Sequence, residues 1–273
     1  MYNRNSENYD MRAVAPTVCK VLGVRPPKQA DAEPLVEVAE TLGAQRRLAV
    51  VVIDAFGAST WTALRMETPA FNTLANRHLL HLRSVMPTIT PVNFSTMLTG
   101  APPDVHLIRD RKEEFSLETV FDVLRERGKS SATAARAVSS LGILISPHAD
   151  HPGIAESNDD REVTRIAIEA MSNDADLLWV QLLDVDDAGH GYGPLSPQGI
   201  AAVKRADQHL REIAETAWRE GYALIVLADH GQHKETRDDG SEYGTHGTTA
   251  DDDVYVPFVW CNVEELGKAL GLS

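Results

Sequence analysis

The segment Ala223-Leu-Ile-Val-Leu-Ala-Asp-His-Gly231 ends an apolar run with an acid, an imidazole and a glycine. Such a run with β-branched members predicts a strand that is buried on both faces of a sheet. Ligands of open α/β sheets bind outside the carboxyl ends of the strands, which is where Asp229 and His230 stand. Carboxylate and imidazole groups together suit Zn²⁺ or Mn²⁺. Taken alone, the pair fits equally well an aspartate that caps a turn beside a surface histidine.

Two other predicted strands also lead into aspartates. Residues 47–54 end at Asp54, and residues 176–184 are followed by Asp186 and Asp187. If these strands are neighbours, their carboxylates face one crevice and repel one another unless cations lie between them. Histidines accompany these acids at three positions: His190, His230 and His246. Three aspartates and three histidines suit two metal ions placed for in-line displacement at phosphorus.

The order of the predicted elements indicates the fold class. Strands that alternate with helices predict an α/β fold, a three-layer α/β/α sandwich with a mainly parallel central sheet. Longer helices are expected over residues 59–77, 117–127, 161–171 and 198–220, and one more should begin at Pro91 with Thr90 as its N-cap. The glycine-rich exit 185–194 and the polar segment 237–253 are expected to be loops, and 143–158 to be irregular.

One catalytic domain is expected over residues 12–273, after a flexible tail over 1–11. A small cap or loop region fits within residues 101–160. Within the domain, a short helix is expected to begin at Pro16 and to end at Gly23.

The charge and hydropathy of the chain exclude some classes of binding partner. The net charge of −14 argues against a nucleic acid polymer, because such binding depends on clustered lysines and arginines. No apolar run reaches the roughly 18 residues that cross a bilayer, so no membrane partner is expected. The polar N-terminus lacks the apolar stretch of a secretory signal, which favours a cytoplasmic location. Cys19 and Cys261 are expected to be buried free thiols. Bound metal ions would still create a positive site for a small phosphorylated substrate.

Five motifs follow one another along the chain: Val-Ile-Asp54, Pro87-Thr-Ile-Thr90 with Asn93 and Gly100, Asp186-x-x-Gly-His190 with Gly193-Pro194, Ala-Asp229-His230-Gly and Gly-x-His246-Gly. In this order they resemble the alkaline phosphatase superfamily over residues 47–260. The likeness is greatest to its type I phosphodiesterase/nucleotide pyrophosphatase and phosphonoacetate hydrolase branch. Each motif is weak alone, and their joint occurrence carries the resemblance.

The resemblance implies two divalent metal ions, expected as Zn²⁺ with Mn²⁺ as the alternative. The implied ligands are Asp186, His190 and His246 for one ion, and Asp54, Asp229 and His230 for the other. Thr90 is implied as the catalytic nucleophile, bound to the second ion. A threonine hydroxyl needs such activation, which a cation and the positive end of a helix both supply. Thr88 and Ser95 are the alternative nucleophiles.

One departure from the family pattern concerns substrate binding. Nucleotide pyrophosphatases carry an asparagine beyond the nucleophile that helps to hold a phosphoryl oxygen, and the corresponding place here is occupied by Arg111. An arginine can bind phosphate oxygens bidentately, although residues 109–112 fit a solvated turn equally well. Asn93 is a second candidate for a substrate contact, with a place on the helix face as the alternative. Residues 12–27 resemble a family element that commonly stands near the C-terminal end of the catalytic domain.

These observations predict a two-metal-dependent hydrolase of phosphate esters (phosphodiesters, pyrophosphates or monoesters) that acts through a phospho-threonine intermediate. The alternatives are a phosphotransferase similar to phosphoglycerate mutase, a phosphonate hydrolase and a non-catalytic metal-binding protein. Around position 90 the sequence lacks the Cys/Ser-x-Pro-x-Arg signature of sulfatases. Asp184 and Asp187 are expected to support the metal-binding segment, and His233 is a candidate contact of a metal ligand.

Overall fold

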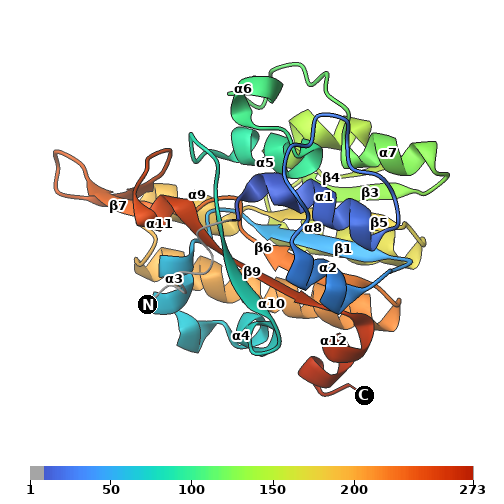
Figure 1. Cartoon of the computed structure of the whole chain (residues 1–273). Helices are drawn as coiled ribbons and strands as arrows, with labels where there is room; N and C mark the ends of the chain where they lie inside the picture. The colour runs from blue at the N-terminus through green and yellow to red at the C-terminus, as the bar shows by residue number, and fades with distance from the viewer. Residues whose placement is uncertain (1–8, 273) are drawn as a thin grey trace.

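The computed structural model describes residues 9–272, and within them a seven-stranded sheet forms the middle layer (Figure 1). The strand order is β2-β9-β6-β1-β5-β3-β4. Its strands are β1 (Leu48–Ile53), β2 (Leu79–Arg83), β3 (Ser131–Arg136), β4 (His151–Ala155), β5 (Leu177–Leu182), β6 (Ala223–Leu227) and β9 (Tyr255–Cys261). β9 runs antiparallel to both of its neighbours, β2 and β6, and the pairs from β6 to β4 are parallel.

Helices cover both faces of this sheet, which confirms the predicted three-layer α/β/α sandwich (Figure 1). One layer contains α1 (Val14–Val21), α2 (Val36–Leu42), α5 (Thr90–Thr99) and α7 (Val120–Glu126). The other contains α4 (Pro69–Ala75), α8 (Asp160–Ser172), α10 (Pro197–Arg219) and α12 (Val263–Leu270). No helix within residues 9–272 combines the length and the apolar character that a membrane span needs.

The central strands fix where the functional residues lie. β1, β5 and β6 are buried along their whole lengths because helices pack on both of their faces, and Gln181 in β5 is their one polar residue. Their registers align the carboxyl ends: Ile53 pairs with Leu182, and Val52 pairs with Leu227. The residues that follow these three strands therefore meet at one edge of the sheet.

The helices expected from residue 59 and from Pro91 differ from those in the structure. The segment 59–77 is divided into α3 (Ala58–Ala63), a 3₁₀ turn (Arg65–Glu67) and α4. Proline disfavours helical backbone in the residue before it, so the helix cannot run through Thr68 into Pro69. Helix α5 begins at Thr90 with Ile89 as N-cap, one residue earlier than expected, and ends at the left-handed Gly100 as expected.

The expected loop over 185–194 is wrong, because most of it forms helix α9 (Asp184–Tyr192). The side chain of Asp160 accepts hydrogen bonds from the N–H groups of Leu183 and Asp184, at 3.0 and 2.8 Å. These bonds satisfy donors at the start of the helix, and they outweigh the glycines that suggested a loop. The irregular segment 143–158 contains the edge strand β4.

The expected loop over 237–253 also contains regular structure. It holds β8 (Glu242–Thr245), which pairs with β7 (His233–Thr236) in a separate hairpin, and α11 (Asp251–Val254).

Residues 9–11, at the end of the expected tail over 1–11, are part of the fold. Residues 1–8 lie outside the described part of the chain. The side chain of Asp10 caps a 3₁₀ turn, and Met11 is buried in the core. The following helix α1 begins at Val14 rather than at Pro16 and packs against α2 and α5.

Residues 101–160 supply α7, β3 and β4 to the layers described above. This segment is therefore part of the sandwich and forms no separate cap domain. Residues 107–116 form an exposed loop in this region. Both cysteines are buried free thiols, as expected.

Candidate active site

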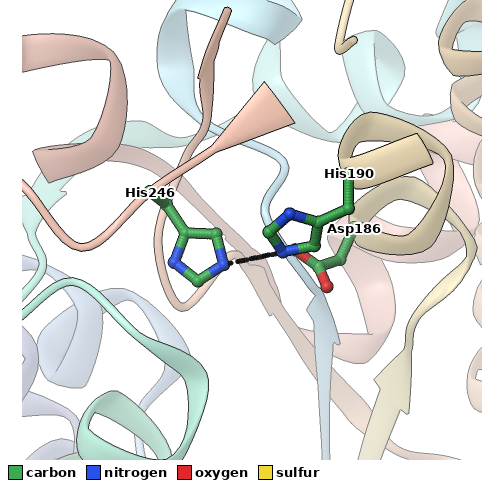
Figure 2. Close-up of side chains that lie close together, drawn as sticks. All are labelled: Asp186, His190 and His246. Atoms are coloured by element: carbon green, nitrogen blue, oxygen red, sulfur yellow. Dashed lines mark hydrogen bonds and ion pairs between the residues drawn. The ribbon is translucent and has the colours of Figure 1, made fainter. Parts of the chain in front are cut away.

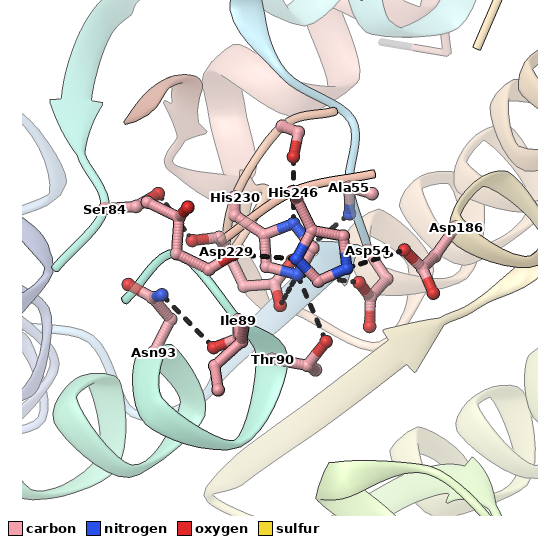
Figure 3. Close-up of polar contacts among 12 residues, drawn as sticks. Asp54, Ala55, Ser84, Ile89, Thr90, Asn93, Asp186, Asp229, His230 and His246 are labelled. Atoms are coloured by element: carbon pink, nitrogen blue, oxygen red, sulfur yellow. Dashed lines mark hydrogen bonds and ion pairs between the residues drawn. The ribbon is translucent and has the colours of Figure 1, made fainter. Parts of the chain in front are cut away.

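Two groups of potential metal ligands meet at the carboxyl edge of the sheet. Each offers three ligand atoms that all lie within 4.8 Å of one another. We call Asp54, Asp229 and His230 the buried group, because all three side chains are fully buried. We call Asp186, His190 and His246 the outer group, because His190 is exposed. The structure thus brings together all six residues named from the sequence (Figures 2 and 3).

The buried group follows from the ends of two adjacent strands. Asp54 directly follows β1, and Asp229 and His230 follow β6. His230 Nε2 lies 3.6 Å from Asp54 Oδ1 and 3.3 Å from Asp229 Oδ2. These two carboxylate oxygens are buried and have no hydrogen-bond partner, whereas the other oxygens accept bonds from the Gln181 amide and the Ala55 N–H. Unpaired buried carboxylate oxygens are costly, and a cation between them would remove that cost.

The outer group joins α9 to the segment after β8 (Figure 2). Asp186 and His190 are four residues apart and therefore share one face of α9. His190 Nε2 lies 3.0 Å from His246 Nε2 and 3.3 Å from Asp186 Oδ1. His246 Nε2 is 3.6 Å from the same carboxylate oxygen.

The hydrogen bonds of the three imidazoles fix their tautomers. Each Nδ1 faces a backbone carbonyl: Gly244 at 2.9 Å for His190, Thr88 at 2.8 Å for His246 and Gly231 at 3.1 Å for His230. A carbonyl only accepts, so the proton of each neutral ring is on Nδ1 and the lone pair of each Nε2 faces the site. Two such lone pairs 3.0 Å apart repel, and a bound cation makes the arrangement favourable.

Burial makes the ionised carboxyl groups unfavourable when no cation is bound. It raises the pKa of Asp54 well above the ordinary value, and the charges of Asp229 and Asp186 raise it further. Burial also raises the pKa of Asp229 to about 7. It lowers the pKa of His246 to about 4, with a further contribution from the nearby His230 ring, and it lowers the pKa of His230. Both histidines are therefore neutral ligands at neutral pH.

Thr90 stands beside the buried group at the first residue of α5 (Figure 3). Its Oγ1 lies 3.1 Å from His230 Nε2. The two alternative nucleophiles are engaged elsewhere. Thr88 Oγ1 donates to the Thr248 carbonyl and accepts from the Gly247 N–H, and Ser95 Oγ donates to the Pro91 carbonyl. Among these three hydroxyls, that of Thr90 lies at the ligand atoms.

Asn93 occupies the place on the helix face that was the alternative to a substrate contact. It is fully buried, its Oδ1 accepts from the Val85 N–H at 2.8 Å, and its Nδ2 faces the carbonyls of Val85 and Ile89 at 3.3 Å. These bonds engage both amide hydrogens and hold the segment that leads into Thr90. Ser84 fixes the same segment to β6, because its Oγ donates to the Asp229 carbonyl at 2.7 Å.

Arg111 is exposed in the loop 107–116, and no hydrogen bond or ion pair holds its side chain to other residues of the described chain. Its contact with substrate stays a prediction. His233 Nδ1 lies 2.7 Å from Asp253 Oδ1, and Asp253 Oδ2 accepts from the N–H and the hydroxyl of Thr248. His233 thus supports the turn that follows His246 rather than a ligand directly.

Sequence reasoning missed a buried ion network behind the outer group. Arg136, at the end of β3, is 1% exposed and contacts the carboxylates of Asp160, Asp184 and Asp187. Asp160 is fully buried and also caps the start of α9. The network therefore fixes the helix that carries Asp186 and His190. A strand that ends in arginine, beside strands that end in aspartates, was the available signal.

The donor sets fit divalent cations. The buried group offers two carboxylates and an imidazole, with the Thr90 hydroxyl close by, and the outer group offers one carboxylate and two imidazoles. Such mixed oxygen and nitrogen sets suit Zn²⁺ and Mn²⁺.

Comparisons with known proteins place the chain in a family. Residues 48–256 match the family model of type I phosphodiesterase / nucleotide pyrophosphatase. The chain is 32% identical over 95 residues to GPI ethanolamine phosphate transferase 1 of Neurospora crassa, which covers 33% of this chain and 9% of that protein. It is 26% identical over 225 residues to the venom phosphodiesterase of Crotalus durissus collilineatus, which covers 70% and 26%. The chain thus spans less than a third of these relatives.

A solved structure shares the fold. The murine ectonucleotide pyrophosphatase / phosphodiesterase 5 superposes with a TM-score of 0.60 at 20% identity, over 71% of this chain and 59% of that one. The alkaline phosphatase-like fold expected from the sequence is thereby confirmed.

Proposed function

The chain belongs to the type I phosphodiesterase / nucleotide pyrophosphatase family, and from this premise we propose that it is a two-metal-dependent phosphate ester hydrolase with Thr90 as its nucleophile. One observation carries the proposal. Two buried carboxylate oxygens, of Asp54 and Asp229, have no partner and converge on His230 Nε2, 3.1 Å from the Thr90 hydroxyl. This arrangement suits a cation and an activated hydroxyl, and it has no structural benefit without them.

The six ligands would hold two divalent ions, Zn²⁺ or Mn²⁺, at the buried and outer groups. Bound there, the ions supply positive charge that favours the ionised hydroxyl and the charge developing on the phosphoryl oxygens. The Nδ1 hydrogen bonds of the three histidines keep each Nε2 available as a ligand.

Thr90 would carry the covalent chemistry. Its ionised Oγ1 attacks phosphorus, the ester P–O bond breaks, and the alcohol leaves with the bonding electron pair and takes up a proton. Water then attacks phosphorus, which releases phosphate or a phosphomonoester and returns the hydroxyl to Thr90. The first turn of α5 has N–H groups without intrahelical partners, and the positive end of this helix favours the anionic phosphoryl group.

Work on the structural neighbour supports this assignment. The murine protein has been solved as an inactive threonine-to-alanine variant in complex with AMP. By analogy, the substrate of the present chain is a small phosphorylated molecule that approaches Thr90.

The test compares wild type with Thr90→Ala and Thr90→Ser on bis(p-nitrophenyl) phosphate and on p-nitrophenyl phosphate, each with Zn²⁺ or Mn²⁺. Loss of a covalent nucleophile is expected to lower kcat on the order of 10³-fold or more, whereas serine retains part of the activity. Metal content serves as the control and should be equal in all three proteins. Full turnover by metal-loaded Thr90→Ala, or a phosphoryl group trapped on another residue, would refute the role of Thr90.

Transfer to an alcohol instead of water is the second candidate function. The similarity to the 2,3-bisphosphoglycerate-independent phosphoglycerate mutase of Wolinella succinogenes, 30% identical over 100 residues, favours it, because a phospho-threonine can also pass its phosphoryl group to a hydroxyl. Incubation with 3-phosphoglycerate separates the two, since a mutase forms 2-phosphoglycerate and a hydrolase forms free phosphate. Phosphonoacetate belongs in the same substrate screen, which then also covers phosphonate hydrolysis.

A further inference from the structure

Gln232 links the two ligand groups but is itself a ligand of neither. It stands two residues after His230 and is 2% exposed. The backbone around it is fixed, because the Gly231 N–H donates to the Asp253 carbonyl at 2.9 Å. A contact between Gln232 and the outer group therefore connects that group to the chain segment that carries Asp229 and His230 of the buried group.

The carboxamide of Gln232 is directed at one outer ligand. Its Nε2 donates to Asp186 Oδ1 at 2.6 Å and approaches the Asp186 carbonyl at 3.2 Å. Both facing atoms are acceptors, so the nitrogen must stand there and the amide oxygen must point away. Asp186 Oδ1 is also the oxygen nearest to His190 and His246. Gln232 therefore sets the orientation of the carboxylate atom that faces the ion.

Two glycines make room for this side chain. A Cβ at Gly189 would lie 1.7 Å from Gln232 Oε1, and a Cβ at Gly244 would lie 2.7 Å from the same atom. Neither glycine has a positive φ, and Gly189 is inside helix α9, where alanine is otherwise preferred. Space for Gln232 thus explains Gly189. At Gly244 a Cβ would also lie 2.8 Å from the Gly189 carbonyl oxygen, so the close approach of α9 requires glycine there as well. Gly244 also accepts the Nδ1 hydrogen bond of His190, so the same slot touches a second outer ligand.

Gln232 also lies at the edge of a cavity next to the ligand groups. It is part of the wall of a pocket of about 540 Å³, which is also lined by α3, residues 193–196 and the β7–β8 hairpin.

We propose that Gln232 is a positioning residue that holds Asp186 for the outer ion and fixes the outer group relative to the buried group. The inference rests on the proposed two-metal function. Loss of a hydrogen-bond partner of a metal ligand typically lowers affinity 10- to 100-fold, and we expect this loss at the outer ion alone.

The experiment titrates chelator-treated proteins with Zn²⁺ by calorimetry and with Co²⁺ by visible absorbance. Gln232→Met keeps the volume but removes both donated hydrogens, so one of two ions should bind at least about tenfold more weakly while the other is unchanged. The matched control is Gln181→Met, because the Gln181 amide donates to Asp54, a ligand of the buried group. Gln181→Met should weaken binding of the other ion, at the buried group. A general loss of stability would not separate the two ions in this way.

A second variant avoids any substitution at Gln232. Gly189→Ala should displace the Gln232 amide and weaken binding of the same ion. In a Gln232→Ala background the added methyl group no longer meets the amide, so Gly189→Ala should cause no further loss of affinity. A wild-type protein that binds fewer than two ions would overturn the proposed function and this inference with it. A wild type with two ions and a Gln232→Met protein that binds both equally tightly would overturn the inference alone.

Discussion

Replacing Asp229 by asparagine tests whether the buried group is built around a cation. Burial raises the pKa of Asp229 to about 7 from its ordinary 3.8. Between these pH values, metal-free folded protein keeps a proton that the unfolded chain has released. Because the pKa of Asp229 is higher in the folded state, the group does not destabilise the fold below pH 3.8. Its destabilising contribution grows as pH rises and is complete at about pH 7.

The pKa values of 3.8 and about 7 give the size of this contribution. The two pKa values differ by about 3, and a pKa difference of 1 corresponds to about 1.4 kcal/mol. In the metal-free protein, Asp229 therefore lowers the free energy of unfolding by about 4 kcal/mol at neutral pH. Asparagine has the same shape, cannot ionise, and can accept the 3.2 Å bond from the Ala55 N–H. Metal-free Asp229→Asn should therefore be more stable than metal-free wild type at neutral pH, with the difference vanishing towards about pH 4.

Urea unfolding of chelator-treated proteins across this pH range measures the difference. With saturating Zn²⁺ the order should reverse, because wild type gains the free energy of ion binding and the variant loses most of it. Asp238→Asn, at an exposed acid on the β7–β8 turn, is the control and should change neither curve. A difference that does not vary with pH, or a metal-free variant less stable than wild type at neutral pH, would refute the reasoning.

Two further substitutions test the surroundings of the site. Arg136→Met leaves the carboxylate of Asp160 buried without its counter-ion and should lower the free energy of unfolding by about 3–5 kcal/mol in urea titrations, so a loss below about 1 kcal/mol would contradict the buried network. Arg111→Ala should raise the KM for a phosphodiester by about tenfold with little change in kcat if the guanidinium binds phosphate oxygens, and an unchanged KM in steady-state assays would leave Arg111 as a solvated surface residue.

The ligand positions could be predicted because they depend on local patterns. A buried parallel strand has a recognisable apolar run, and the residue that follows it must lie at the carboxyl edge of the sheet. Asp54 and Asp229 are of this kind. The register of β1 with β5 and β6 then brings these ends together, and that alignment follows from burying every side chain of the three strands.

Other features depend on contacts between distant parts of the sequence. Helix α9 is capped by Asp160, which lies 24 residues before Asp184, and a local reading of its glycines therefore indicated a loop. The role of Asn93 depends on which face of α5 meets the segment around Val85, and composition does not reveal that. The hairpin of β7 and β8 has few apolar residues, so its strands carried no periodic signal.

The antiparallel direction of β9 has a consequence for how the chain can vary. Because β9 runs against its neighbours, the polypeptide enters the sheet beside the reactive centre and needs no crossing helix to bring His246 there. The exposed hairpin tip at Asp238–Gly240 precedes this entry and joins β7 to β8, outside the seven-stranded sheet. Added length at that tip would change the surroundings of the two ligand groups while the seven-stranded sheet stayed as it is, so we expect sequence variation in this family member to be tolerated best at this point.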